Sequence, residues 1–546
     1  MKIALSQQNY LIGDFEGNRN KILEGIRQAR EQGADLIIFS ELCVCGYPPR
    51  DFLEFKDFIQ QCEESVNLIA SEAVGIAALI GAPSVNPKPE GKDLFNSSFF
   101  LFDGKIQQVT HKSLLPHYDV FDEYRYFEPN QEFQAYDFAE KRIAFTVCED
   151  IWNEGNNPLY ITSPVDHLSE FNPDYLLNIS ASPFHYTKAE ERIALLKGLA
   201  QDHHLPIFYC NTVGAQTELI FDGGSLVVTP DGEVFDEMSY WKEEMRLYDL
   251  DEVIHSKNNG NSEQPKKKIT LIHDALVCGI REYFGKLNFQ KAILGLSGGI
   301  DSAIVTCLAV SALGKENVKC LLMPSEFSSE GSISDSELLA KNLECEYEIV
   351  PIREPYNSAL SVLNPLFQGK SFDVTEENLQ ARIRAMILMA MCNKHHYILL
   401  NTSNKSEMAV GYGTLYGDMC GGISVLGDVY KTEVYQLAEY INREKQIIPQ
   451  NIISKPPSAE LRPGQKDSDS LPEYSILDKI LFHYIEERKG PKELVKMGFE
   501  KSLVDRVLRM VNISEHKRYQ SPPVLRVSPK AFGSGRRVPI VAKYLG

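Results

Sequence analysis

Hydrophobic and polar positions follow two different periods along the chain, and together they predict strands alternating with helices. In roughly the first 252 residues, short runs rich in β-branched and aromatic residues predict strands. These runs are Ile3–Ser6, Leu36–Ser40, Ser98–Phe102, Ile143–Val147, Leu176–Ile179, Ile207–Cys210 and Ser225–Thr229. Helices are predicted at Arg19–Gln32 and Lys188–His203, and tight hairpin turns at Asp103-Gly104 and Asp231-Gly232.

A polar stretch then divides the chain. Residues 255–268, HSKNNGNSEQPKKK, have no apolar periodicity and predict a linker. A predicted helix, Ile269–Gly285, is followed by strands that alternate with helices, which is typical of a doubly wound parallel sheet. The strands are Ala292–Leu296, Val318–Met323, Tyr347–Pro351 and Tyr397–Asn401. We therefore expect a domain of residues 1–254, a linker of residues 255–268 and a domain of residues 269–546.

Composition and charge narrow the classes of function. The chain has 546 residues, 43% hydrophobic and 24% charged, as in ordinary globular proteins, which excludes a disordered chain and a small disulfide scaffold. A formal net charge of −19 argues against nucleic acid or an anionic membrane as partner, but leaves room for a local phosphate pocket. The start does not resemble a signal peptide, no apolar run approaches the roughly 18 residues of a membrane span, and the 11 cysteines include no CxxC pair. The expected location is the cytoplasm, with reduced thiols.

A candidate phosphate site follows the first predicted strand of the second domain. That strand runs directly into Ser297-Gly298-Gly299-Ile300-Asp301-Ser302, and an apolar helix comes next. Glycines let backbone N–H groups approach an anion, the helix dipole favours negative charge, and Ser297 and Ser302 add hydroxyl donors. Asp301 would repel a phosphate unless a cation lies between them, which suggests Mg²⁺. The alternative is an ordinary strand-to-helix turn with Asp301 as a local cap. Neither the Walker A nor the Rossmann glycine spacing fits the chain.

This loop resembles the pyrophosphate loop of N-type ATP pyrophosphatases, which split ATP into AMP and pyrophosphate while adenylylating an acid. Five further segments resemble the NAD synthetase family within that group, over nearly all of residues 268–546: 380–384, 401–407, 411–418, 428–432 and 457–461. The resemblance implies an adenine nucleotide alpha hydrolase-like α/β fold, with ATP as co-substrate and Mg²⁺ as cofactor. The site residues that it implies are Ser297, Gly298, Gly299, Asp301, Ser302 and Thr402 for ATP, Asp301 and Glu407 for the metal, and Arg382, Asp418 and Lys431 for deamido-NAD⁺.

Spacing adds an argument for two of these residues. In the helix that begins at Thr375, Leu379 and Met386 belong to a predicted apolar stripe, and Arg382 falls on it. A guanidinium there needs an anionic partner, either a protein carboxylate or a ligand. Glu407 follows the end of a predicted strand, where open α/β sheets bind ligands, and this position favours a second Mg²⁺ ligand; the alternative is a solvated helix residue.

Three apolar runs of the first domain each end in a reactive residue: Glu41, Lys112 and Cys148. A carboxylate can take a proton from a thiol, and a lysine can stabilise a developing oxyanion. Singly, they are an inert buried thiol and two surface charges. In this order, each at a strand end, they resemble the nitrilase (carbon–nitrogen hydrolase) superfamily over about residues 1–250. That resemblance implies a four-layer αββα sandwich.

The segment Phe121–Phe127 resembles the glutaminase branch of that superfamily, which occurs fused to NAD synthetase domains. The resemblance implies that Glu123 is an additional structural carboxylate, although its spacing from Lys112 is longer than in stand-alone amidases. Lysine at position 188, where arginine is common, keeps a charge for the α-carboxylate of the substrate but loses bidentate geometry. The residues implied to hold L-glutamine are Tyr118, Glu149, Trp152, Ser182 and Lys188.

Taken together, the two resemblances imply one reaction. The first domain releases ammonia from L-glutamine, and the second uses ATP to activate deamido-NAD⁺ and aminate it, giving NAD⁺, AMP, pyrophosphate and glutamate. They also imply a homo-oligomer built on a dimer of synthetase domains. One alternative is a nitrilase-type amidase whose C-terminal domain only senses nucleotide, and another is a non-catalytic nucleotide-binding scaffold. Within the amide-forming class, another acceptor acid is a further alternative.

Overall fold

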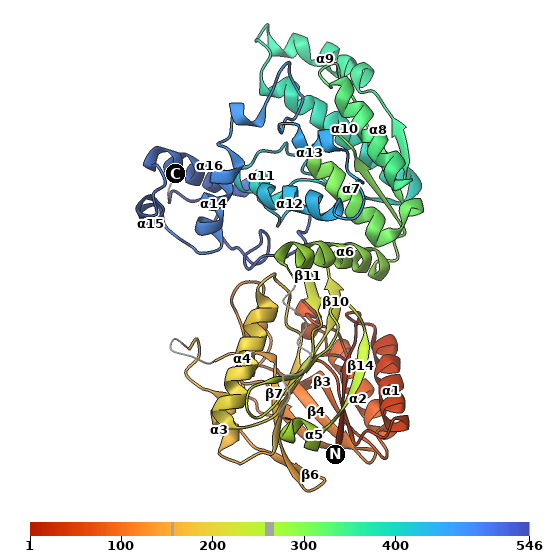
Figure 1. The fold of residues 1–546 in the computed structure, drawn as a ribbon, viewed down its shortest axis with the longest axis vertical. Coiled ribbons are helices and arrows are strands. Elements are labelled where there is room, and N and C mark those ends of the chain that lie inside the picture. Colours follow the sequence, from red (N-terminus) through yellow and green to blue (C-terminus); the bar gives the residue numbers. More distant parts are fainter. Residues whose placement is uncertain (154–157, 257–266, 545–546) are drawn as a thin grey trace. The chain divides into compact units, whose positions relative to one another are not determined.

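The computed structural model describes residues 1–153, 158–256 and 267–544, and the chain divides into two compact units, residues 1–266 and 267–546. Each unit is described by itself (Figure 1). Of the expected linker, residues 257–266 lie outside the described residues. Its first residue, His255, ends helix α5 (Leu250–His255), and Lys268 begins helix α6 (Lys268–Lys286). No helix among the described residues is long and apolar enough to cross a membrane.

Two six-stranded sheets form the centre of the first unit. Their strand orders are β14-β1-β2-β3-β4-β5 and β13-β12-β9-β8-β7-β6, with parallel pairs in the middle and antiparallel pairs toward the edges. The strands are β1 (Lys2–Gln7), β2 (Leu36–Ile38), β3 (Ala77–Val85), β4 (Leu94–Phe102), β5 (Lys105–His111), β6 (Tyr136–Phe138), β7 (Lys141–Val147), β8 (Tyr175–Ser180), β9 (Ile207–Asn211), β12 (Leu226–Val228), β13 (Val234–Glu237) and β14 (Glu244–Asp249). A separate hairpin pairs β10 (Val213–Gln216) with β11 (Leu219–Asp222).

The two sheets pack face to face, and helices cover their outer faces. Alternate residues such as Leu5 and Phe145 point into the core between the sheets, while Ala4 joins the core under α1 (Phe15–Glu31) and α2 (Lys56–Glu72). Helices α3 (Pro164–Ser169) and α4 (Lys188–His203) cover the second sheet. Figure 1 shows α1 and α4 on opposite sides of the strands. The expected αββα sandwich is confirmed.

The second unit is built on a parallel sheet in the order β17-β16-β15-β18-β19. Its strands are β15 (Lys291–Gly295), β16 (Val318–Leu322), β17 (Glu346–Ile349), β18 (Tyr397–Asn401) and β19 (Ile423–Ser424). The chain adds β16 and β17 on one side of β15 and then crosses to add β18 and β19 on the other. The doubly wound arrangement is confirmed, and the direction reverses between β15 and β18, where such sheets bind ligands.

Helices lie on both faces of this sheet. Ile293, Leu321 and Leu399 of the strands meet α9 (Arg353–Phe367) and α10 (Val374–His395) in one core. On the other face, α7 (Ile300–Leu313) places Thr306 Oγ1 3.9 Å from Cys320 Sγ, and α6 and α12 (Lys431–Ile441) pack on α7. The remaining helices are α8 (Glu330–Leu343), α11 (Lys405–Val410), α13 (Gln450–Ser454), α14 (Tyr474–Ile485), α15 (Pro491–Lys496), α16 (Lys501–Ile513) and α17 (Glu515–Arg518).

Of the apolar stripe expected on α10, Leu379 packs partly against the core, but the stripe does not continue along the buried face. Met386 is 59% exposed, and Arg382 is exposed as well, with its Nε donating to the Leu415 carbonyl at 3.2 Å. The buried stripe runs instead through Ala381, Ala385, Leu388 and Cys392, at the spacing i, i+4, i+7 and i+11. Apolar residues occur all around this helix, so the sequence period alone was ambiguous, and contact with the sheet selected the other face.

Candidate active sites

Glu41, Lys112 and Cys148 meet where three strands of the first unit end. Glu41 follows β2, Lys112 follows β5 and Cys148 follows β7, and the Lys112 ammonium donates to Glu41 Oε1 at 2.7 Å. Cys148 begins the short 3₁₀ helix η3 (Cys148–Ile151) with φ of 44°, in the left-handed region that a residue with a side chain rarely occupies. Such strain persists where the surrounding structure holds a reactive residue in place, as in the nucleophile elbow of hydrolases.

A second carboxylate completes this cluster. Lys112 also donates to both oxygens of Glu123, at 2.8 and 2.9 Å, and the side chains of Lys112 and Glu41 are completely buried. Asn96 Nδ2 reaches Glu41 at 2.7 Å and Glu123 at 3.3 Å, and the Tyr47 hydroxyl donates to Glu123 at 2.9 Å. Sequence reasoning missed Asn96 and Tyr47 as site residues. Asn96 is the third residue of β4, and its role depends on the register that sets it beside Lys112.

Burial and the neighbouring charges together shift the pKa values of the cluster. Burial raises the pKa of the Cys148 thiol well above its usual value; Glu41 adds to this shift and Lys112 opposes it. Burial also raises the pKa of Glu123 to about 7, against the pull of Lys112. For Lys112, burial disfavours the charge, but Glu123 and Glu41 outweigh it and the pKa rises well above the usual value. These shifts favour a neutral Cys148 thiol beside a charged Lys112 ammonium.

Asp150 joins the nucleophile strand to the lysine loop. Its carboxylate accepts from the backbone N–H of Val147 at 2.9 Å, and from Ser113 and Leu114 at 2.8 and 2.9 Å. The sequence signal was an acidic residue two positions after Cys148, but its partners come from a distant loop. Asp150 thus fixes the position of Lys112 relative to Cys148.

Four of the residues implied to hold glutamine form two pairs beside this cluster, Tyr118 with Glu149 and Trp152 with Lys188. Glu149 accepts from the hydroxyls of Tyr118 at 2.8 Å and of Tyr160 at 3.0 Å, and burial raises the pKa of Glu149. The Lys188 ammonium lies 3.3 Å from the centre of the Trp152 ring, and burial lowers the pKa of Lys188 to about 8. Tyr160 was not predicted from the sequence.

The fifth of these residues, Ser182, is buried and held through its backbone. Its N–H donates to Asn211 Oδ1 at 2.9 Å. Asn211 Nδ2 donates in turn to the Gly223 carbonyl at 2.9 Å. The loop that carries Ser182 is therefore tied to β9 and to the turn after β11.

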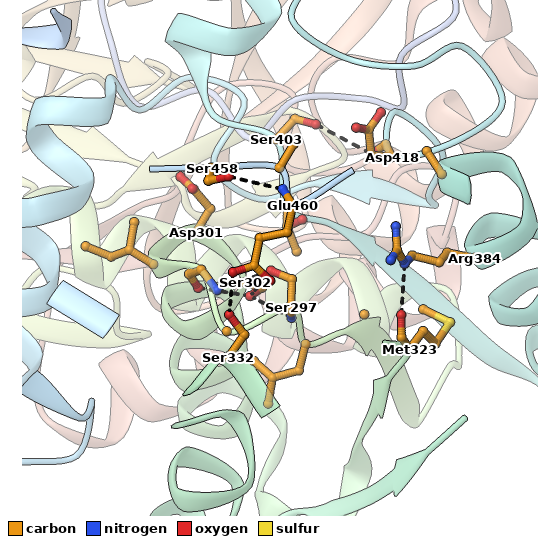
Figure 2. A pocket seen from close by; sticks show the side chains of 18 of the residues that line it. Ser297, Asp301, Ser302, Met323, Ser332, Arg384, Ser403, Asp418, Ser458 and Glu460 are labelled. Carbon is orange, nitrogen blue, oxygen red and sulfur yellow. Dashed lines mark hydrogen bonds between the residues drawn. The ribbon is translucent and has the colours of Figure 1, made fainter. Parts of the chain in front are cut away.

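A cavity of about 300 Å³ opens at the carboxyl ends of β15, β16 and β18 in the second unit, at the reversal point of the sheet. Figure 2 shows side chains that line it. Its lining includes all the residues implied for ATP, for the metal and for deamido-NAD⁺ except Arg382: Ser297, Gly298, Gly299, Asp301, Ser302, Thr402, Glu407, Asp418 and Lys431. The residues that the resemblance implies for the second domain, other than Arg382, therefore line one pocket.

The loop before α7 has the shape of an anion site. Ser302 Oγ accepts from the Ser297 N–H at 3.2 Å and donates to the Gly299 carbonyl at 3.0 Å. These two hydrogen bonds hold the loop in a closed turn. Gly298 has φ of 80°, and a Cβ at that position would lie 2.5 Å from the Ser332 carbonyl oxygen. Only glycine fits there, and the N–H groups at the start of α7 are left facing the cavity.

Two carboxylates stand around one ammonium at the cavity wall. Lys431 Nζ pairs with Asp301 Oδ2 and lies 3.5 Å from Glu407 Oε1. Asn404 caps α11 through the Glu407 N–H at 3.0 Å and donates to Asp301 Oδ1 at 2.9 Å. Burial raises the pKa of Glu407 to about 8; Asp301 adds to the shift, and Lys431 opposes it.

This donor set fits a magnesium ion shared with phosphates. Mg²⁺ prefers oxygen ligands and is usually held by one or two carboxylates, substrate phosphates and water. Asp301 and Glu407 supply two carboxylates beside the anion loop. The described residues contain no cluster of three or more His, Cys, Asp and Glu side chains suited to a metal. Among the described residues, a metal ion at this site would therefore need ligands from substrate or water in addition to the two carboxylates.

Arg384, rather than Arg382, extends into the cavity from α10 (Figure 2). Its Nε donates to the Met323 carbonyl at 3.0 Å. Burial lowers the pKa of Arg384 to about 10, against the attraction of Asp418 and Glu460. The sequence does show a second arginine two positions after Arg382. Sequence reasoning passed over it because Arg382, and not Arg384, was placed on the face of α10 expected to be buried.

The loop of residues 455–461 lines another side of the cavity and contacts the start of α8. Glu460 accepts from Ser329 Oγ at 3.0 Å and from Ser332 Oγ at 2.9 Å, and it pairs with Lys455. Figure 2 shows the Glu460 side chain extending toward Ser332, a residue of α8. Sequence reasoning noted residues 457–461 only as a resembling segment and assigned them no role.

Comparison with known proteins gives the same division. Residues 2–257 match the carbon–nitrogen hydrolase family model, and residues 272–521 match the NAD synthase family model. The chain is 43% identical to a glutamine-dependent NAD(+) synthetase of Synechocystis sp., covering 99% of both chains, and 40% identical to one of Thermotoga maritima, covering 100% of this chain and 99% of that one.

Solved structures agree. The glutamine-dependent NAD⁺ synthetase of Acinetobacter baumannii, determined in complex with ADP, is 37% identical, with a TM-score of 0.79 over 99% of this chain and 98% of that one. The synthetase of Cytophaga hutchinsonii, 20% identical with a TM-score of 0.84 over 99% of this chain and 98% of that one, has the same fold. Both units have their counterpart in full-length relatives, and the chain belongs to the glutamine-dependent NAD(+) synthetase family.

Proposed function

We propose that the chain converts deamido-NAD⁺ to NAD⁺ with ATP and with ammonia taken from L-glutamine, releasing AMP, pyrophosphate and glutamate. The observation that carries the proposal is the pair of sites in one chain. A thiol–carboxylate–lysine cluster suits amide cleavage, and an anion loop with two carboxylates suits ATP activation. Full-length relatives that bear the name of this activity support both assignments.

In the first unit, Lys188 and Glu149 would hold the α-carboxylate and the α-ammonium of glutamine, with Tyr118, Trp152 and Ser182 shaping the pocket. Glu41 accepts the thiol proton of Cys148, and sulfur attacks the carboxamide carbon. The Lys112 ammonium stabilises the oxyanion that forms. Glu41 then returns the proton to the leaving ammonia, and water cleaves the thioester to glutamate.

In the second unit, the N–H groups and hydroxyls of Ser297–Ser302 and Thr402 would bind ATP phosphates. Asp301 and Glu407 would hold Mg²⁺, which when bound neutralises phosphate charge. Lys431, Asp418 and Arg382 would orient deamido-NAD⁺. Its nicotinate carboxylate attacks the α-phosphate of ATP, which releases pyrophosphate, and ammonia then displaces AMP from the mixed anhydride.

We also propose a homo-oligomer built on a dimer of second units. Helices α9 and α10 leave several large apolar side chains exposed, among them Val362, Leu366 and Met386. Apolar surface of this kind typically marks an interface. Arg382 lies on the same exposed side of α10 as Met386, so in a dimer it would be covered. Light scattering should give a multiple of the 61.6 kDa chain mass, and Leu366→Glu should lower it.

The decisive experiment is mass detection of products with glutamine, ATP and deamido-NAD⁺. NAD⁺, AMP, pyrophosphate and glutamate should appear together. An amidase whose second unit only senses nucleotide would give glutamate without pyrophosphate, and a binding scaffold would give neither. Replacing deamido-NAD⁺ by other carboxylic acids tests the acceptor.

A further inference from the structure

A completely buried ammonium lies next to the cavity of the second unit without lining it. Lys405 Nζ pairs with Asp428 Oδ1 and with Glu486 Oε1, each at 2.8 Å, and donates to Ser528 Oγ at 2.8 Å and to the Lys530 carbonyl at 2.9 Å. The side chains of Lys405, Asp428 and Glu486 are at most 3% exposed. An ammonium can donate three hydrogen bonds, so Lys405 is fully engaged inside the protein.

The two segments joined by this ammonium carry Glu407 and Lys431 of the cavity, and the first of them also contacts Asp301 of α7 through Asn404. Lys405 lies one residue after Asn404, which holds Asp301, and two residues before Glu407. Asp428 lies three residues before Lys431. The backbone repeats the connection, because the Lys405 N–H donates to the Val429 carbonyl and the Lys431 N–H donates to Ser406 Oγ, both at 2.9 Å.

The third segment comes from the far end of the chain. Asp428 Oδ2 accepts from the N–H groups of Val527 and Ser528 at 2.8 and 2.6 Å, and Asp428 Oδ1 accepts from Ser528 Oγ at 2.8 Å. Ser424 of β19 forms a parallel bridge with Val524. Residues 523–530 therefore extend the sheet edge and then close over Lys405.

From this arrangement we propose that Lys405 is a positioning residue of the synthetase reaction. Its ammonium holds the start of α11 against residues 428–431, and this contact sets the separation of Glu407, Asp301 and Lys431. Without Lys405, the buried carboxylates of Asp428 and Glu486 would face each other without a cation, and α11 would lose its side-chain contact with the 428–431 segment. The segment 523–530 contributes to this positioning, because Ser528 Oγ is hydrogen-bonded to both Lys405 and Asp428. The inference rests on the function proposed above.

The test uses Lys405→Met in the full chain, with ammonia as nitrogen donor and Mg²⁺ varied. Methionine keeps most of the volume and removes the charge. We expect the Mg²⁺ concentration at half-maximal rate to rise at least about tenfold and kcat to fall, because Asp301 and Glu407 would no longer be held together. Glutamine hydrolysis by the first unit should stay within about twofold. Lys405→Arg, which keeps the charge, should recover part of the Mg²⁺ response.

Two further variants separate positioning from general stability. Ser528→Ala removes one bond to Lys405 and one to Asp428 and should shift the Mg²⁺ curve in the same direction by less. Lys501→Met, which breaks an exposed ion pair with Asp505 on α16, should leave the curve unchanged.

Specific outcomes would overturn the inference. An unchanged Mg²⁺ curve with a lowered melting temperature in Lys405→Met would make Lys405 merely structural. If Lys405→Met does not fold, an unchanged curve in Ser528→Ala has the same consequence. If the wild-type chain makes no NAD⁺ from deamido-NAD⁺ at all, the proposed function fails instead.

Discussion

Both units place a lysine between two carboxylates, and the two clusters differ in what surrounds them. Lys112 is enclosed with Glu41 and Glu123, with contacts of 2.7 and 2.8 Å and side chains no more than 6% exposed. Lys431 pairs with Asp301 but lies 3.5 Å from Glu407, and both of these carboxylates line an open cavity. The first cluster is satisfied within the chain and suits a neutral amide substrate. The second leaves carboxylates facing the space where a polyanion and its cation would bind.

The backbone shows the same contrast. In the first unit the positive φ falls on the reactive residue itself, Cys148. In the second it falls on Gly298, which adopts that conformation without steric cost and brings backbone donors toward the cavity. Strain at Cys148 is consistent with a residue that forms a bond, and the relaxed turn at Gly298 with a loop that only binds.

The sharpest way to break this division is Cys148→Ala. Glutamine-dependent synthesis should fall by at least about 10³-fold, because the thioester cannot form, while ammonia-dependent synthesis should stay within about twofold. Both rates are measured as NAD⁺ formed. Loss of both activities in a folded variant would show that the two sites do not work separately.

Asp301→Asn tests the open cluster. Asparagine keeps the size but removes the charge beside the anion loop, so ammonia-dependent synthesis should fall about 10²-fold at limiting Mg²⁺, with glutamine hydrolysis retained. Asp505→Asn, at an exposed ion pair of the same unit, is the matched control and should have no effect. A wild-type rate for Asp301→Asn would reduce Asp301 to a turn residue.

The pH dependence of glutamine use should report Lys188. Burial lowers the pKa of Lys188 to about 8, so its ammonium is present below that pH and is lost above it. Because only the charged form attracts the α-carboxylate, the KM for glutamine should rise up to about tenfold per pH unit above about 8. In Lys188→Arg the side chain stays charged, and the rise should disappear. A flat wild-type profile between pH 7 and 9.5 would contradict this role.

The smallest effect is expected from Arg382→Ala. Arg382 is exposed and bonds a backbone carbonyl, so the melting temperature should change little. If it contacts deamido-NAD⁺ in the assembled protein, the KM for that substrate should rise about tenfold, which corresponds to one charged hydrogen bond of about 1.5 kcal/mol. Equal KM values for Arg382→Ala and wild type at saturating ATP would remove Arg382 from the site. Arg384→Ala is the informative comparison, since Arg384 lines the cavity.

Local patterns were sufficient for most of the secondary structure around the sites. The predicted run Ile143–Val147 lies in β7, and the predicted helix Lys188–His203 is α4 to the residue. Helix α1 begins four residues earlier than predicted because the Asp14 side chain caps it through the Gly17 N–H. Helix α2 and strand β3 were not predicted.

The sequence by itself determined where chemistry would stand, because parallel strands end at one edge of a sheet and their following residues meet there. That logic pointed to the loop that begins at Ser297, whereas Glu41, Lys112 and Cys148 were read as one cluster only through their resemblance to the nitrilase superfamily. It could not identify residues whose role depends on contacts across the fold. Asn96 became a site residue only through strand register, and Lys405 only through partners brought by β19, α14 and the C-terminal segment. The buried face of α10 was likewise chosen by packing, because the helix is apolar on all sides and only contact with the sheet distinguishes Arg384 from Arg382.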